Sequence, residues 1–130
     1  MYNHWISLAS FYGAAAVVLG AFGAHALASH LPPARLASWE TAVQYHLLHA
    51  VVLLALGLSY GRHDRRVALS AWSFSLGIML FSGSIYGLVL TDWRWLGPIT
   101  PIGGVCLIVG WIALAPLGWA RNLSTAGESS

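Results

Sequence analysis

The chain has 130 residues, of which 58% are hydrophobic and only 8% charged, with a formal net charge of +2. Soluble globular domains carry roughly 25% charged residues, and so short a chain cannot bury this much apolar surface in a core of its own. The composition therefore excludes an ordinary soluble domain and indicates a membrane protein. The small net charge gives no reason to expect nucleic acid as a partner.

Four apolar runs are long enough to cross a bilayer, which takes about 20 mostly apolar residues. They are Trp5–Leu27, Ala42–Tyr60, Val67–Leu90 and Pro98–Trp119, and none contains Asp, Glu, Lys or Arg. The first run exceeds the ~7–15 residues of a signal-peptide core, so we expect a span rather than a signal peptide. The sequence predicts an all-α integral membrane protein with four transmembrane helices in a small bundle.

The segments between the runs predict further elements. Pro33 suits the first turn of a helix, where its missing N–H is harmless, so a short interfacial helix is expected from Pro33 through Trp39 that bends or continues into the second span. Trp39, Trp93, Trp95 and either Tyr2 or Trp5 are expected in the aromatic belts at the membrane surfaces. The prolines and glycines that open the fourth run predict irregular or kinked backbone there: Pro98, Pro101, Gly103 and Gly104.

The arginines predict the orientation, because the chain has no lysine. Four of the six lie on the side of the termini and the second connection: Arg62, Arg65, Arg66 and Arg121. By the positive-inside rule, both termini are expected to face the cytoplasm. Residues 1–120 form a single transmembrane domain in this prediction, and residues 121–130, which have no apolar face, form a disordered cytoplasmic tail.

Polar side chains gather in the half of each span that this topology places on the outer side. Such groups are costly in lipid and usually face the bundle interior or a water-filled cavity, so the sequence predicts a polar pocket that opens outward. Its candidate residues are His25, Tyr45, His46, His49, Ser82, Ser84, Tyr86 and Thr100. His25 and His46 are expected at similar depth, with His49 almost one turn deeper. The alternative is that these groups only hydrogen-bond to neighbouring helices.

Small residues recur at helical spacing in the first, third and fourth spans. They let helix backbones approach closely, which favours association in lipid. The glycines predicted to lie at helix–helix contacts are Gly13, Gly20, Gly23, Gly83, Gly87, Gly103 and Gly104. These packing faces also fit a homo-oligomer or a larger membrane complex.

Four motifs, one in each span and in order, resemble the signatures of domain-of-unknown-function family 423, a family of small four-helix membrane proteins. They are GAFGAH (20–25), TAVQYHLLHA (41–50), LFSGSIY (80–86) and TPIGG (100–104). The resemblance covers nearly the whole chain except the tail and implies a bacterial inner membrane, with a mitochondrial transmembrane relative. It implies no established activity. The family often has glutamine at the position of His46, which leaves His25 and His49 as the stronger pair.

Three classes of function follow from these residues. The first is a non-enzymatic bundle that binds or passes a small polar species, or stabilises a larger complex. The second is a haem or metal protein with His25 and His49 as ligands, because histidine is the commonest metal ligand. An intramembrane enzyme is the least favoured, since no span carries Asp or Glu for general-base work. The sequence identifies no cofactor.

Overall fold

The computed structural model describes residues 3–59 and 64–128, with residues 120–128 described by their backbone alone. Within these residues, the helices long and apolar enough to cross a membrane are His4–Leu27, Pro33–Ser59, Arg65–Thr91 and Arg94–Trp119. No strand is found in the described part of the chain. The predicted fold class, an all-α membrane protein with four spans, is confirmed.

Two of the spans contain a π-helical turn. The elements are α1 (His4–Phe22), the π-helical η1 (Gly23–Leu27), α2 (Pro33–Ser59), α3 (Arg65–Gly77), the π-helical η2 (Ile78–Ser82), α4 (Gly83–Thr91), the 3₁₀ turn η3 (Arg94–Leu96) and α5 (Ile99–Glu128). A π-helical turn inside an α-helix is rare and often marks a functional position. Each turn overlaps one of the motifs quoted above, η1 with GAFGAH (20–25) and η2 with LFSGSIY (80–86).

Local side chains set where the helices begin and end. The Asn3 side chain accepts a hydrogen bond from the Trp5 N–H (3.2 Å) at the start of α1. The Asp64 carboxylate accepts one from the Arg66 N–H (2.8 Å) at the start of α3. Both are N-caps, which satisfy N–H groups that the helix itself leaves unpaired. The α4 helix ends at Thr91, and the next residue, Asp92, has a left-handed backbone (φ 62°) and donates its N–H to the Leu88 carbonyl oxygen.

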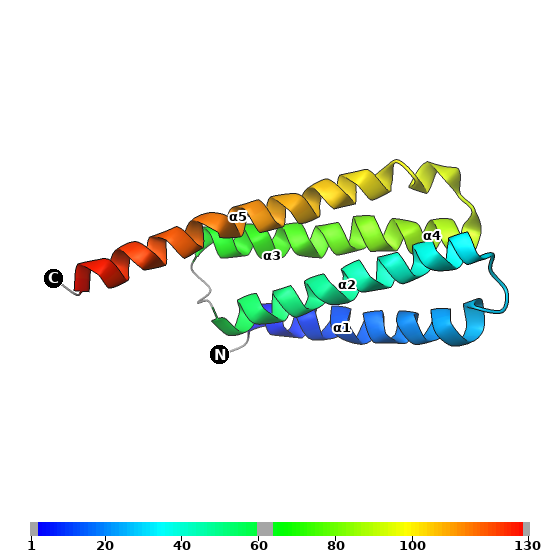
Figure 1. The fold of residues 1–130 in the computed structure, drawn as a ribbon, viewed down its shortest axis with the longest axis horizontal. Coiled ribbons are helices and arrows are strands. Elements are labelled where there is room, and N and C mark those ends of the chain that lie inside the picture. Colours follow the sequence, from blue (N-terminus) through cyan, green and yellow to red (C-terminus); the bar gives the residue numbers. More distant parts are fainter. Residues whose placement is uncertain (1–2, 60–63, 129–130) are drawn as a thin grey trace.

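The spans lie side by side in the order α1, α2, α3–α4, α5 (Figure 1). Helix α1 packs on α2, α2 packs on η2 and α4, and α5 packs on α3 and η2. Helix α1 begins and α5 ends on one side, here called the termini end (Figure 1). The opposite side, here called the hairpin end, carries the connections at 28–32 and 92–98.

Two buried clusters hold the spans together. The larger extends from the termini end to the middle of the bundle, with Trp5, Leu53, Phe74 and Leu107 among its members. The smaller lies at the hairpin end and consists of Leu27, Trp39 and Val89 with their neighbours. The hairpin end therefore has less buried side chain to fill it than the rest of the bundle.

Helix α2 joins the expected interfacial helix and the second span into one element. It begins at Pro33, as expected, and runs to Ser59 without a break, since no glycine or proline occurs between Pro33 and Gly57. Trp39 was expected at a membrane surface but is fully buried, and its indole N–H donates to the Leu19 carbonyl (2.9 Å) of α1. An unbroken helix turns this ring inward onto α1.

The fourth span differs from the expectation at its start. Irregular backbone is confined to residues 92–98, and Pro101, Gly103 and Gly104 continue α5 without interruption. Pro101 lies in the first turn, where a missing N–H costs no intrahelical bond. Beyond Trp119 the backbone is helical to Glu128, and the cytoplasmic tail expected over residues 121–130 stays a prediction. No proline interrupts residues 121–128; residues 129–130 lie outside the described part.

Candidate functional site

His49 lies in the middle of the bundle with both ring nitrogens engaged. Its Nδ1 is 2.7 Å from the Tyr45 carbonyl oxygen, which can only accept, so Nδ1 carries the proton. Its Nε2 then accepts from the indole N–H of Trp111 (3.2 Å), which can only donate. The ring is 3% exposed. These partners fix a neutral tautomer and connect α2 to α5.

His46 and two tyrosines make a second set of contacts at this level. His46 Nδ1 lies 3.1 Å from the Tyr86 hydroxyl, and its ring meets Tyr12 edge-on at 5.7 Å. The Tyr12 hydroxyl donates to the Ser75 carbonyl oxygen (3.1 Å) of α3. His46 Nε2 is buried and has no hydrogen-bond partner among the described residues. We call Tyr12, Tyr45, His46, His49, Tyr86 and Trp111 the mid-bundle network.

The predicted pocket hydroxyls bond mainly across to neighbouring helices. Ser82 donates to the Ala42 carbonyl oxygen (2.7 Å) of α2. The hydroxyls of Ser84 and Thr100 share a hydrogen bond (2.6 Å) that connects α4 to α5. These bonds match the alternative weighed in the sequence analysis, in which the hydroxyls satisfy one another and the backbone. Tyr45 is exposed, and its ring stacks on the His49 ring. Its hydrogen bond to His49 comes from the backbone carbonyl, not from the side-chain hydroxyl.

His25 does not join this network, which corrects the expectation that it closes a pocket with Tyr45 and His49. It is exposed and lies in η1, near the end of the first span. The α1 residue at the level of His46 is Tyr12, thirteen positions and therefore about 20 Å along the helix from His25. The expected equal depth assumed a second span that starts at Ala42. Helix α2 starts nine residues earlier, so His46 lies deeper than expected.

The same placement bears on the haem or metal hypothesis. Both nitrogens of His49 already bond to the protein, and His25 lies near the other end of the span. Within residues 3–59 and 64–119, no group of three or more His, Cys, Asp or Glu side chains could hold a metal ion. The geometry therefore gives no support to His25 and His49 as a ligand pair.

Four of the seven predicted packing glycines lie at close helix contacts. A Cβ on Gly23 would lie 2.5 Å from the Trp39 ring, and one on Gly20 would lie 3.2 Å from Val43. A Cβ on Gly87 would lie 2.8 Å from Leu96. Gly103 rests directly on the backbone of Leu80 and Phe81 in η2. Each π-helical turn therefore makes a close helix contact at a glycine: η1 through Gly23 against Trp39, and η2 against Gly103 of α5.

The other three glycines are packed loosely. A Cβ on Gly104 would make an ordinary contact at 3.8 Å with Phe81, and Gly13 and Gly83 have nothing within 4 Å. Three further glycines that were not predicted also make close contacts. Gly57 lies against α1, Gly77 against α5 and Gly110 against the Phe74 ring. Ser70, whose hydroxyl donates to the Gly110 carbonyl oxygen (2.8 Å), was also missed. These glycines are single residues in apolar runs and carry no motif that would have marked them.

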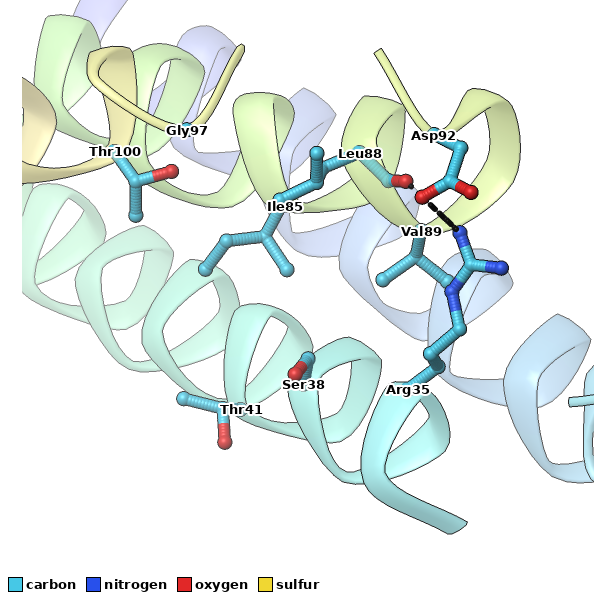
Figure 2. A pocket seen from close by; sticks show the side chains of 9 residues that line it. All are labelled: Arg35, Ser38, Thr41, Ile85, Leu88, Val89, Asp92, Gly97 and Thr100. Carbon is cyan, nitrogen blue, oxygen red and sulfur yellow. Dashed lines mark hydrogen bonds and ion pairs between the residues drawn. The ribbon is translucent and has the colours of Figure 1, made fainter. Parts of the chain in front are cut away.

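A cavity of about 450 Å³ lies at the hairpin end between α2, α4 and the start of α5 (Figure 2). Its lining consists of Arg35, Ser38, Thr41, Ile85, Leu88, Val89, Asp92, Gly97 and Thr100. We call it the hairpin cavity. Three aliphatic side chains, three hydroxyls and two charged groups line it, and only Thr100 was among the predicted pocket residues. Because Ser38, Thr41 and Asp92 are exposed, the cavity opens to the surface of the bundle.

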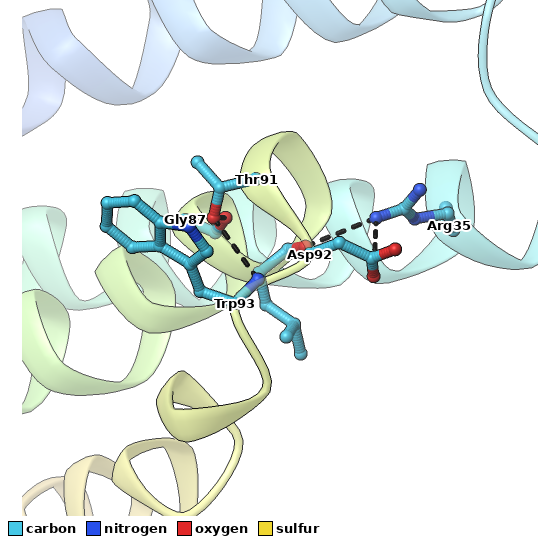
Figure 3. A network of polar contacts seen from close by, with 6 residues as sticks. Arg35, Gly87, Thr91, Asp92 and Trp93 are labelled. Carbon is cyan, nitrogen blue, oxygen red and sulfur yellow. Dashed lines mark hydrogen bonds and ion pairs between the residues drawn. The ribbon is translucent and has the colours of Figure 1, made fainter.

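An ion pair stands at one end of this cavity (Figure 3). Arg35 Nη2 donates to Asp92 Oδ1 (3.1 Å) and to the Leu88 carbonyl oxygen (3.3 Å). Next to it, the Thr91 hydroxyl donates to the Gly87 carbonyl oxygen (2.6 Å). The pair joins the first turn of α2 to the last turn of α4. A signal in the sequence existed: Arg35 and Asp92 flank two spans on the same side of the membrane.

The comparisons with known proteins identify the family. The model of DUF423, described as a protein of unknown function, matches residues 19–104. The chain belongs to this family. The match includes every residue that lines the hairpin cavity, whereas Tyr12 and Trp111 of the mid-bundle network lie outside it.

Relatives of this DUF423 protein carry the name UPF0382 membrane protein. The one from Staphylococcus epidermidis is 46% identical over 99 residues, which is 76% of this chain and 81% of the relative. The one from Haemophilus influenzae is 41% identical over 116 residues, 88% and 93% of the two chains. The one from Bacillus subtilis is 44% identical over 101 residues, 76% and 82%. No solved structure matches. These matches confirm the family resemblance that the motifs indicated. They also confirm the prediction of a membrane protein.

Proposed function

We propose that this protein is a non-enzymatic membrane protein that binds one lipid-like amphiphile in the hairpin cavity. The observation that carries the proposal is the composition of the lining, which combines an aliphatic wall with hydroxyls and an ion pair. The volume falls in the range of small-molecule sites, about 300–1,000 Å³. A purely polar solute would leave the aliphatic wall exposed to water. A purely apolar solute would make no hydrogen bond or ion pair with the charged groups.

The arrangement of the lining suits an amphiphile that lies along the helices. Arg35 and Asp92 stand at one end of the cavity, and Thr100 and Gly97 stand toward the other (Figure 2). Ile85 lies between them, about 10 Å along the helix from Asp92. A polar head would lie near the ion pair at the helix ends, and an apolar chain would extend along α4 into the bilayer.

The lining gives less support to catalysis. It contains no histidine or cysteine, and its carboxylate belongs to Asp92, which is paired with Arg35. General-base catalysis needs a base within hydrogen-bond reach of the proton it removes, and the hydroxyls of Ser38 and Thr41 donate to carbonyls of their own helix instead (3.1 and 3.0 Å). Binding therefore fits this set of groups better than chemistry.

The test measures which molecules stay bound to the protein after extraction in a mild detergent, by native mass spectrometry. In Ser38→Trp the indole ring should fill part of the cavity, so retention of a co-purified amphiphile should fall by about tenfold or more. Ser10→Trp is the matched control, because Ser10 is also exposed and also donates to the carbonyl four residues earlier (2.8 Å), but on α1. Equal retention by wild type and Ser38→Trp, or no retention by either, overturns the proposal.

We also propose a bacterial inner-membrane location with both termini on the cytoplasmic side, so that the hairpin cavity opens on the outer side. The arginine distribution supports this orientation. In a variant without Cys106, a cysteine at Thr91 should react with an impermeant thiol reagent in intact cells, and one at Ser59 should not. Both positions are exposed on the bundle, at opposite ends. The reverse labelling pattern would refute the orientation.

A further inference from the structure

The mouth of the hairpin cavity carries one positive and one negative side chain, Arg35 and Asp92. Building on the proposed function, we infer that the bound amphiphile is a zwitterionic phospholipid of the bilayer, with its phosphate at Arg35 and its ammonium group at Asp92.

Arg35 keeps donors for a phosphate. Both of its hydrogen bonds within the described residues use Nη2, which reaches Asp92 and the Leu88 carbonyl. A guanidinium has five N–H donors, so Nε and Nη1 remain to bond an anion. The side chain is 37% exposed, which leaves it open to a ligand. Guanidinium groups suit phosphate because their fixed fork of donors matches its oxygens.

Asp92 keeps an acceptor for a cation. Its side chain is 82% exposed, and Arg35 occupies only Oδ1. The residue directly follows α4, whose C-terminal carbonyls form the negative end of the helix dipole and favour a cation nearby. An ammonium group at Oδ2 would therefore meet two negative features of the protein.

The balance of charge discriminates among headgroups. A purely anionic headgroup at Arg35 would also lie against the Asp92 carboxylate and the end of α4, and like charges placed together cost binding energy. A headgroup without charge would leave both side chains to pair only with each other. A headgroup with one phosphate and one ammonium matches the site on both sides.

The depth of the pair is that of a lipid headgroup. Arg35 lies in the first turn of α2 and Asp92 immediately after α4, so both stand at the ends of their spans. The exposed, stacked rings of Trp93 and Trp95 lie on the same connection, as expected of an aromatic belt. The aliphatic wall of Ile85, Leu88 and Val89 extends from the pair toward the middle of the membrane, where acyl chains lie.

The test titrates the full chain in a neutral detergent with three lipids that share the same acyl chains and counts bound lipid by native mass spectrometry. They are dioleoylphosphatidylethanolamine (zwitterionic), dioleoylphosphatidylglycerol (anionic) and dioleoylglycerol (uncharged). The zwitterionic lipid should bind about tenfold more tightly than either of the others. Asp92→Asn should reduce that preference over the anionic lipid, and Arg35→Gln should weaken both phospholipids.

The control variants remove equivalent charges outside the cavity. Glu40→Gln and Arg94→Gln change exposed residues at the same end, and both should bind the three lipids like wild type. The comparison of lipids on the wild-type protein needs no variant, so it decides the headgroup even where loss of the ion pair destabilises the corner between α2 and α4.

The outcomes separate this inference from the proposed function. Equal or tighter binding of the anionic lipid overturns the zwitterionic assignment and leaves an amphiphile site in place. Equal binding of all three, abolished by Ser38→Trp, also overturns only the headgroup. If none of the three binds and Ser38→Trp retains the same co-purified molecules as wild type, both the inference and the proposed function fail.

Discussion

The middle of the bundle and its hairpin end use polar side chains in opposite ways. In the middle, both nitrogens of His49 and the hydroxyls of Tyr12 and Ser82 have partners on the protein, and His46 Nε2 is the buried side-chain atom of the described residues that has none. At the hairpin end, Arg35 and Asp92 border a cavity, and their side chains are 37% and 82% exposed. Polar residues within a membrane span therefore do not by themselves indicate a binding site, because hydrogen bonds between helices can account for them.

The largest expected effect comes from Gly103, where α5 meets the backbone of η2. Gly103→Ala should destabilise the fold by about 3 kcal/mol or prevent folding, because the new methyl group has only backbone to displace. Gly83→Ala is the control, since nothing lies within 4 Å of that position. Thermal unfolding in detergent measures both. A Gly103→Ala protein as stable as Gly83→Ala would contradict the packing described here.

The next largest effect is expected from a substitution in the middle of the bundle that leaves the hairpin cavity unchanged. His49→Leu should cost about 2–3 kcal/mol, because the Trp111 indole loses its acceptor and the α2–α5 connection is lost. His25→Leu should change stability little, since that side chain is exposed. Amphiphile retention in folded His49→Leu should match wild type. Lost retention with unchanged stability would instead make His49 part of a ligand site.

Thr100 belongs to both regions, because its hydroxyl bonds Ser84 and its surface lines the hairpin cavity. Thr100→Val keeps the shape and removes the hydrogen bond, so it should lower stability by about 1 kcal/mol. Thr100→Ser keeps the hydroxyl and should retain more of the stability. Unfolding midpoints of the two variants measure the difference, and a Thr100→Val protein more stable than Thr100→Ser would show that this bond contributes nothing.

The smallest effect is expected at His46. His46→Gln should cost less than about 1 kcal/mol, because an amide can still bond the Tyr86 hydroxyl and its second polar group replaces a ring nitrogen that already lacks a partner. His46→Leu should lower stability more, since it leaves the Tyr86 hydroxyl without its hydrogen-bond partner. Thermal unfolding of both variants gives the order, and a larger loss for Gln than for Leu would mean that the imidazole has a role of its own.

The spans and the start of α2 were predictable because they depend on local properties, namely apolar length and the position of Pro33. Relative depth was not, since the hydrophobic run at Ala42 begins nine residues after the helix itself. The partners of Tyr12 and Ser82 are backbone carbonyls on other helices, which no side-chain pattern reveals. The hairpin cavity was not predicted because Arg35 and Asp92 are 57 residues apart in the chain, and their shared side in the predicted topology does not show that they pair.

The π-helical turn η2 determines which way the later side chains of the third span face. Such a turn closes its hydrogen bonds from i to i+5 and so holds about one residue more than an α-helical turn. In an α-helix each residue is rotated by about 100° from the one before. Deletion of a single residue within 78–82 would make the third span a regular helix and swing Ser84, Tyr86 and Asp92 by about that angle. Both the mid-bundle network and the ion pair thus depend on one additional residue in η2.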